Sequence, residues 1–158
     1  WAVQSPDKKW LQTSVTWVFW EDFEPNQWAS VHSPHLQSLS DPTANPEERK
    51  KALDALGQSW GATIKSALHE TLRAADTPED LKTLIAQRLK QHPSRDNLQV
   101  MVNELSQAQS LKLQKALMAP LRIYHPKGPK ISKEMDISER NKAIETWKQW
   151  WEDNKDSI

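Results

Sequence analysis

Two histidines, His32 and His35, have the spacing in the chain that could hold a metal ion. Positions three apart lie on one face of a helix, so both imidazoles could bind the ion, with Asp41 or Glu24 as a third ligand. However, Pro34 lies between the two histidines, and no second pair of ligands is spaced to help. Solvent-facing loop histidines are the simpler interpretation, so the sequence predicts no metal and no cofactor.

A second candidate for chemistry is the acidic group Glu21, Asp22 and Glu24, which follows an aromatic stretch. A carboxyl group beside tryptophan can have a raised pKa that suits acid catalysis. Indole faces also stack on sugar rings, so a carbohydrate-binding or glycan-active domain stays open as the alternative function. The simpler interpretation is the acidic end of a helix. No motif marks a nucleophilic serine and the chain has no cysteine, so the sequence favours a non-catalytic role.

The composition excludes several other classes of protein. The 158 residues include 21 basic and 21 acidic side chains, so the net charge is zero and nucleic acid is not an expected partner. Three glycines form no phosphate-binding loop, and no apolar run reaches the ~20 residues that span a bilayer. The chain begins with Trp1 and lacks cysteine, which is consistent with a removed signal peptide or anchor. We therefore expect a bacterial periplasmic or secreted protein, or the soluble part of a membrane-associated complex.

Tryptophan is the unusual feature of the composition, with nine residues of this type. Trp147 and Trp151 have the four-residue spacing of a buried helix face, and core packing explains most of the others. Nine is nevertheless more than one small core usually needs, and tryptophan is enriched where proteins bind each other. Three lysines in a proline-rich stretch could in addition meet an anionic partner. The candidate partner-binding residues are Trp10, Trp17, Trp20, Trp28, Lys127, Lys130 and Lys133.

Helix start signals recur along the chain. Ser5, Asn45 and Thr77 each precede a proline that is followed by acidic residues, which is the pattern of a capped helix beginning. Ser94 or Asp96 marks another start, and Asp136 with Glu139 forms a capping-box pattern. Apolar residues at three- and four-residue steps then predict helices over 46–75, 78–92, 94–119 and 137–153.

Two regions fit this helical pattern less well. Residues 14–20 are β-branched and aromatic, as in a strand, but we find no obvious strand to pair with them, so a buried helix is the favoured interpretation. Residues 119–135 contain three prolines and a glycine, which predicts an irregular connection. The organisation we expect is a Trp-rich segment over 1–45, made of a helix and a loop that pack on the bundle or on a partner, and a helical domain over 46–158.

The last helix carries both an internal similarity and a resemblance. Residues 45–60 and 136–151 share six identical positions at a fixed offset along the chain; internal duplication is possible, but capped amphipathic helices commonly look alike. Residues 122–124 read RIY and residues 139–151 read ERNKAIETWKQWW, a segment that resembles the closing helix of bacterial HEAT-repeat proteins. The resemblance is confined to the C-terminal part of the chain and implies stacked helical hairpins with a protein-binding or scaffolding role.

Together these patterns predict an all-α single domain of four to six helices. It would be either an antiparallel bundle or a short HEAT-like helical array. Two features depart from the HEAT pattern: the helix over 46–75 is too long, and no clear repeat of HEAT length runs through the middle of the chain. The expected function is a non-catalytic protein-binding or assembly module with a protein partner.

Overall fold

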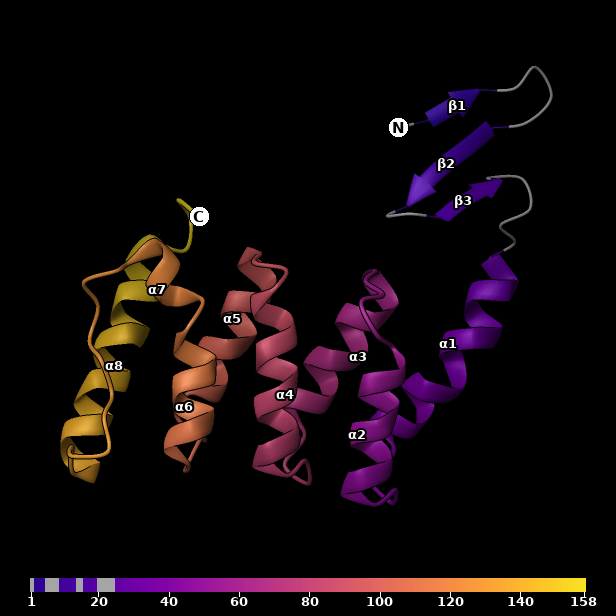
Figure 1. Cartoon of the computed structure of the whole chain (residues 1–158). Helices are drawn as coiled ribbons and strands as arrows, with labels where there is room; N and C mark the ends of the chain where they lie inside the picture. Colours follow the sequence, from indigo (N-terminus) through magenta and orange to yellow (C-terminus); the bar gives the residue numbers. More distant parts are fainter. Residues whose placement is uncertain (1, 5–8, 14–15, 20–24) are drawn as a thin grey trace.

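The computed structural model describes residues 2–4, 9–13, 16–19 and 25–158, with side chains from His32 onward. Three short strands come first, followed within the described residues by eight helices (Figure 1). The strands are β1 (Ala2–Gln4), β2 (Lys9–Thr13) and β3 (Thr16–Phe19). The helices are α1 (Pro25–Ser40), α2 (Pro46–Ala55), α3 (Ala62–Arg73), α4 (Glu79–Lys90), α5 (Arg95–Glu104), α6 (Leu111–Met118), α7 (Leu121–Tyr124) and α8 (Ile137–Asn154).

The helical region confirms the all-α prediction, with more helices than the four to six expected. β3 corrects the helix predicted through residues 14–20 at the part of it that the structure describes, Thr16–Phe19. β2 is the partner strand that the sequence pattern did not reveal, and the sheet is antiparallel in the order β1-β2-β3. β-branched and aromatic residues fit a pleated surface better than a helix once a partner strand exists. The helix start predicted at residues 5–7 lies outside the described residues.

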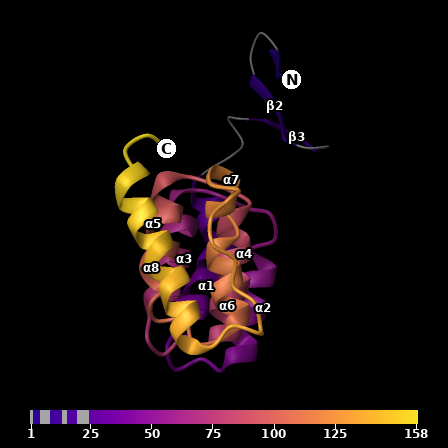
Figure 2. The ribbon, with the colours of Figure 1, turned by 90° about the vertical axis from the view of Figure 1, so that its left-hand side faces the viewer.

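The helices form a two-layered array in which each pair stacks on the next. α1, α3, α5 and α8 contact one another in this order and make one layer, whereas α2, α4 and α6 make the other. Figure 2 views the array from the α8 end and shows the two layers beside each other. Within each pair, α1 packs on α2, α3 on α4 and α5 on α6. The array is therefore a row of stacked helical hairpins, and α1 belongs to it.

The helix predicted over 46–75 is two helices, α2 and α3. The chain turns at Gly57, whose φ of 52° lies in the left-handed region that glycine adopts without a steric penalty. Gly57 donates its N–H to the Asp54 carbonyl at 2.9 Å, which closes the end of α2. Neither α2 nor α3 has the excessive length that distinguished the helix predicted over 46–75 from a HEAT helix.

The helix predicted over 94–119 is also divided, into α5 and α6. Ser110 caps α6 by accepting the Leu113 N–H, and Glu79 of α4 accepts the N–H groups of Gln109 and Ser110 at 2.6 and 2.9 Å. Partial burial raises the pKa of Glu79, but its hydrogen bonds to Ser110 and Gln109 outweigh that effect and lower the pKa below its ordinary value. A glutamate 30 residues away thus fixes a break that local periodicity does not reveal.

A regular interval relates the helices of successive pairs. In one layer, α2, α4 and α6 begin at Pro46, Glu79 and Leu111; in the other, α3 and α5 begin at Ala62 and Arg95. Within a layer, the first residues of successive helices are therefore separated by nearly the same number of residues. The similarity between residues 45–60 and 136–151 instead relates α2 to α8, which lie in different layers. It does not follow the structural interval, so the likeness of capped amphipathic helices explains it better than duplication does.

The predicted caps agree with the structure at three positions. Asn45 accepts the Glu48 N–H, Ser94 accepts the Asn97 N–H, and Asp136 with Glu139 forms the full capping box. At Thr77 the helix begins as expected, but the threonine hydroxyl accepts a hydrogen bond from Arg49 in place of a helix N–H.

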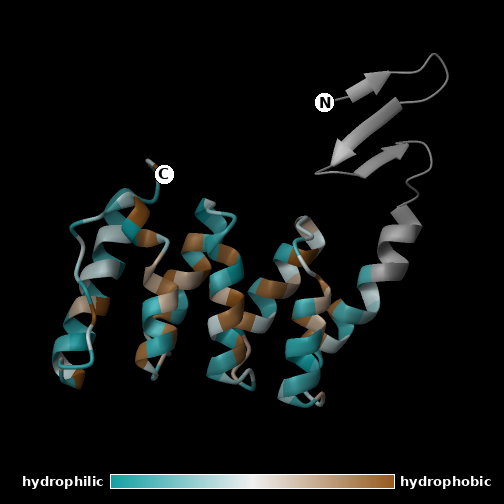
Figure 3. Ribbon diagram, viewed as in Figure 1, coloured by the Kyte–Doolittle hydropathy of each residue, from teal (hydrophilic) through white to brown (hydrophobic). Residues whose placement is uncertain are grey.

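The hydrophobic core lies between the two layers of helices. One apolar side of each helix faces this space, and hydrophobic residues recur along the helices in Figure 3. Trp147 and Trp151 of α8 are fully buried there, as their four-residue spacing predicts. The core therefore continues to the last helix of the array.

Buried polar groups connect neighbouring pairs of helices. Arg49 of α2 is 2% exposed; it donates to the Leu39 carbonyl of α1, to Asp76 and to Thr77. Lys82 of α4 and Glu104 of α5 form an ion pair at 3.0 Å in which both side chains are almost completely buried. Because each of these groups has a partner, the cost of burying the charge is offset.

Replacing Arg49 tests this connection. Arg49→Gln leaves the Leu39 carbonyl and the Thr77 hydroxyl without their donor, so we expect the free energy of unfolding to fall by about 2 kcal/mol. The measurement is urea denaturation followed by circular dichroism. The matched control is Arg73→Gln, because Arg73 is exposed on α3, and it should change stability by less than about 0.5 kcal/mol. Equal effects of the two substitutions would contradict the assignment.

His69 makes the stability of the array depend on pH. Its Nε2 donates to Asn97 Oδ1 at 2.7 Å, and burial lowers the pKa of His69 below the ordinary value of 6.5. The unfolded chain therefore binds a proton more readily, so stability should fall as the pH drops below about 6.5. The lowered pKa values of Glu79 and Asp96 act at more acidic pH, below their ordinary values of 4.5 and 3.8.

The measurement is urea unfolding at several pH values from slightly alkaline to mildly acidic, on both sides of the ordinary histidine pKa. We expect the parent chain to lose stability across this window and His69→Gln to lose clearly less over the same window. His35→Gln is the matched control, since it removes a half-buried imidazole of α1. A parent chain whose stability does not change between these pH values would disprove the role of His69.

Candidate functional site

The candidate site is the irregular connection between α7 and α8. We call residues 126–133 the strap; they run along the last helices from α7 to the beginning of α8 (Figure 1). The sequence predicted an irregular connection over 119–135, and the structure differs only by the short helix α7 within it. The strap contains the three lysines predicted to bind a partner.

Exposure along the strap repeats every three residues. Lys127, Lys130 and Lys133 are exposed, whereas Gly128 and Ile131 are buried. Lys127 lies in a turn that Gly128 closes by donating its N–H to the His125 carbonyl at 3.0 Å, and Lys133 lies in a second turn just before α8. We call these three exposed lysines, which recur along the length of the strap, the lysine row.

Trp147 of α8 fixes the inner side of the strap. Its Nε1 donates to the Pro129 carbonyl at 3.0 Å, and its ring lies directly against Gly128. A Cβ added at Gly128 would lie 2.3 Å from the Trp147 ring, so only glycine allows this approach. Ile131, 5% exposed, adds an apolar contact with the core. The lysine row thus rests on a fixed backbone.

The strap is rich in positive charge that few acids neutralise. Within the described residues Lys127 and Lys130 form no ion pair, and Lys133 lies 3.9 Å from Glu134, with both side chains largely exposed. Exposed pairs of this kind contribute little free energy. A hydrogen bond from Ser132 lowers the pKa of Glu134, so this carboxylate remains ionised at neutral pH. The lysines are available to another molecule.

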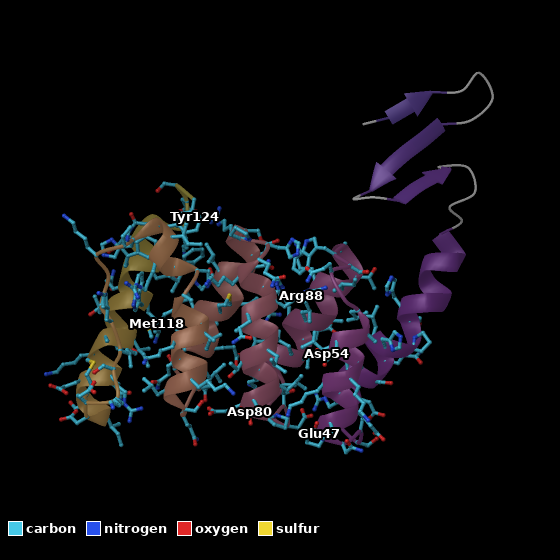
Figure 4. The ribbon with its side chains drawn as sticks, viewed as in Figure 1. Glu47, Asp54, Asp80, Arg88, Met118 and Tyr124 are labelled. Atoms are coloured by element: carbon cyan, nitrogen blue, oxygen red, sulfur yellow. The ribbon has the colours of Figure 1, made fainter. Side chains whose placement is uncertain are left out.

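Apolar side chains lie next to the start of the strap. Ile123 is 58% exposed and Tyr124 is 41% exposed, and both belong to α7. Figure 4 shows Tyr124 at the edge of the array beside α7, whereas Glu47 and Asp80 lie at the opposite edge. The sequence marks these two apolar residues only as part of the RIY segment at residues 122–124. Their four-residue helix is too short for periodicity to reveal which side is buried.

A ring cluster joins His125, the residue before the strap, to α8. His125 stacks on Trp150 with 5.3 Å between ring centroids, and both rings meet Trp147 edge to face. His125 and Trp150 also line a shallow, open groove of about 1250 Å³ along the outer side of α8. The groove carries side chains of both charges, including Lys142 and Glu145, so it favours neither an anion nor a cation.

The other predicted residues lie elsewhere. Register places Trp10 opposite Phe19 and Trp17 opposite Gln12 in the sheet. Trp28 belongs to α1, and Trp20 lies outside the described residues, as do the acidic residues Glu21, Asp22 and Glu24. The sequence placed the candidate partner-binding residues in one set, whereas the structure divides those it describes between the sheet, α1 and the strap.

The histidine pair His32 and His35 lies in helix α1, which corrects the loop predicted for it. Both residues are half-buried, and His32 Nε2 lies 3.4 Å from the Ser59 hydroxyl. In the described part of the chain, no group of three or more potential metal ligands comes together. The helices described in the structure also include none with the length and hydropathy needed to cross a membrane.

Gly128 offers a test of how the strap is held. Gly128→Ala places a methyl group inside the Trp147 ring, so we expect a loss of about 1–3 kcal/mol in unfolding free energy and a changed near-UV signal from Trp147. The matched control is Gly61→Ala, where a Cβ meets no atom within 4 Å and φ is extended at 173°. That control should keep parental stability and spectrum. Equal effects at both glycines would show that the strap is not seated on Trp147.

Comparison with known proteins assigns the chain to no family. No family model matches it, and neither a curated protein nor a solved structure shows a match.

Proposed function

We propose that the chain is a non-catalytic protein-binding or assembly module, built as a short HEAT-like array of helical hairpins. The observation that carries the proposal is the stacking of α1 to α6 and α8 in two layers. In arrays of this kind each repeat contacts only its neighbours, and the row of repeats exposes a long surface that binds other proteins.

Three further features bear on the proposal. The division of the 46–75 region into α2 and α3 gives helices of ordinary length for such repeats. α8, whose sequence resembles the closing helix of HEAT-repeat proteins, occupies the end of the array. The interval between successive helix starts in a layer is shorter than the HEAT period of roughly 40–47 residues. The likeness between this chain and HEAT-repeat proteins therefore concerns the arrangement of the helices more than the length of the repeat.

The N-terminal sheet supplies one candidate binding surface. Residues directly opposite each other in an antiparallel sheet share a face, and so do alternate residues of one strand. The register therefore places Trp10, Trp17 and Phe19 on one face, and Leu11 with Val18 on the other. A face with two tryptophans and a phenylalanine has the composition of binding hot spots, so we assign partner contact to it.

Paired substitutions in the sheet test the proposal. Trp10→Thr with Trp17→Thr keeps strand propensity but removes both indoles, so we expect loss of a stable protein complex recovered by purification from the native organism. The matched control, Leu11→Thr with Val18→Thr, changes the opposite face and should retain the complex. Helical circular dichroism should remain at the parental level in both variants.

Two results would contradict the proposal. One is that the first variant retains the complex as fully as the control does. The other is that soluble glycans shift the tryptophan fluorescence and that Glu21→Gln or Glu24→Gln abolishes an enzymatic activity. That second result would instead support the glycan-active alternative.

A further inference from the structure

We propose that the strap binds an extended acidic segment of a protein partner. The carboxylates of the segment would pair with Lys127, Lys130 and Lys133, while an apolar residue at one end contacts Ile123 and Tyr124. This inference deepens the proposed function, on which it rests, by naming the chemistry of a partner at the α8 end of the array.

The fixed backbone of the strap is the first argument. The Trp147 hydrogen bond to Pro129, the close approach of Gly128 and the buried Ile131 hold the strap at three neighbouring positions. A partner therefore meets lysines whose main chain is already ordered, and less conformational entropy is lost on binding. Lysines in an unattached loop would not share this advantage.

The shape of the charged surface indicates the partner's form. The three exposed lysines recur at every third residue of the strap, which runs along α8 in Figure 1, so their positive charge is spread along the strap and is not gathered at one point. The buried side of the strap is apolar or glycine, so the positive charge is confined to the outer side. A narrow, extended chain fits such a row better than a broad surface does.

The surroundings of the strap favour a protein segment over an anionic membrane. Glu134 lies at the end of the strap, and Asp136 and Glu139 cap the beginning of α8 just beyond it; all three are exposed. These carboxylates would be repelled by a flat anionic surface that covered the row. Ile123 and Tyr124 at the other end add an apolar contact, and contacts of this type anchor protein interfaces.

The direct experiment measures peptide binding to the full chain by fluorescence anisotropy at low salt. The probe is a short fluorescein-labelled peptide with one leucine at an end and glutamate at every third position. The strap variant carries Lys127→Gln, Lys130→Gln and Lys133→Gln. We expect its Kd to be about eightfold weaker than that of the parent, a factor of about two for each exposed ion pair, and we expect added salt to weaken parental binding.

The matched control removes three positive charges from other exposed positions, with Lys51→Gln, Arg73→Gln and Lys90→Gln. It should bind the peptide as the parent does, and a peptide with glutamine in place of glutamate should bind neither protein. An equal loss of affinity in the control and strap variants would overturn the inference, because overall charge would then explain binding. Parental affinity in the strap variant would overturn it as well.

Two more outcomes separate this inference from its alternatives. Strap-dependent binding to vesicles containing phosphatidylserine, without binding to the peptide, would replace the protein segment with a membrane surface. If the parent fails to bind the peptide while the complex that depends on Trp10 and Trp17 still forms, this inference is wrong and the proposed function stands.

Discussion

The structure depends on one constraint, which is that no helical pair of this chain can bury its apolar side alone. The helices have about three turns or fewer in the middle of the array, and an isolated hairpin of that size leaves its hydrophobic side in water. Stacking each pair on the next covers that side, and the core therefore runs continuously from Leu39 of α1 to Trp151 of α8. Stability is shared between neighbours in such an array.

Polar contacts determine how the successive pairs are aligned. Arg49 connects α1 and α2 to the turn before α4, Glu79 connects α4 to the start of α6, and Lys82 pairs with Glu104 of α5. Apolar packing alone would allow the helices to slide, because it is not directional. Apart from the bond between Arg49 and Leu39, these contacts join residues at least 22 positions apart in sequence, so together they select one arrangement of the stacked pairs.

The difference between contacts within one short segment and contacts between distant segments explains how much of the fold the sequence could reveal. Caps such as Asn45 and Ser94 are local, since a side chain and a nearby N–H suffice, and they were predicted correctly. The division between α5 and α6 depends on Glu79, which lies on another helix, and β3 depends on pairing with β2. The lysines of the strap were recognised by composition and spacing, but the position of their backbone depends on Trp147, whose indole N–H binds the Pro129 carbonyl 18 residues earlier.

Trp147 therefore joins the core to the candidate site. One side of its ring system completes the packing at the end of the array, and its N–H with the adjacent ring edge holds the strap. Trp147 and Trp151 of α8 both belong to the core, and the strap lies directly against Trp147. The strap covers this part of the core with Gly128 and Ile131, whereas Lys127, Lys130 and Lys133 are exposed. Because the covering residues recur every third position, the exposed residues do too, and three of those are lysine. The contacts that hold Gly128, Pro129 and Ile131 thus leave the three lysines as exposed side chains spaced along the strap.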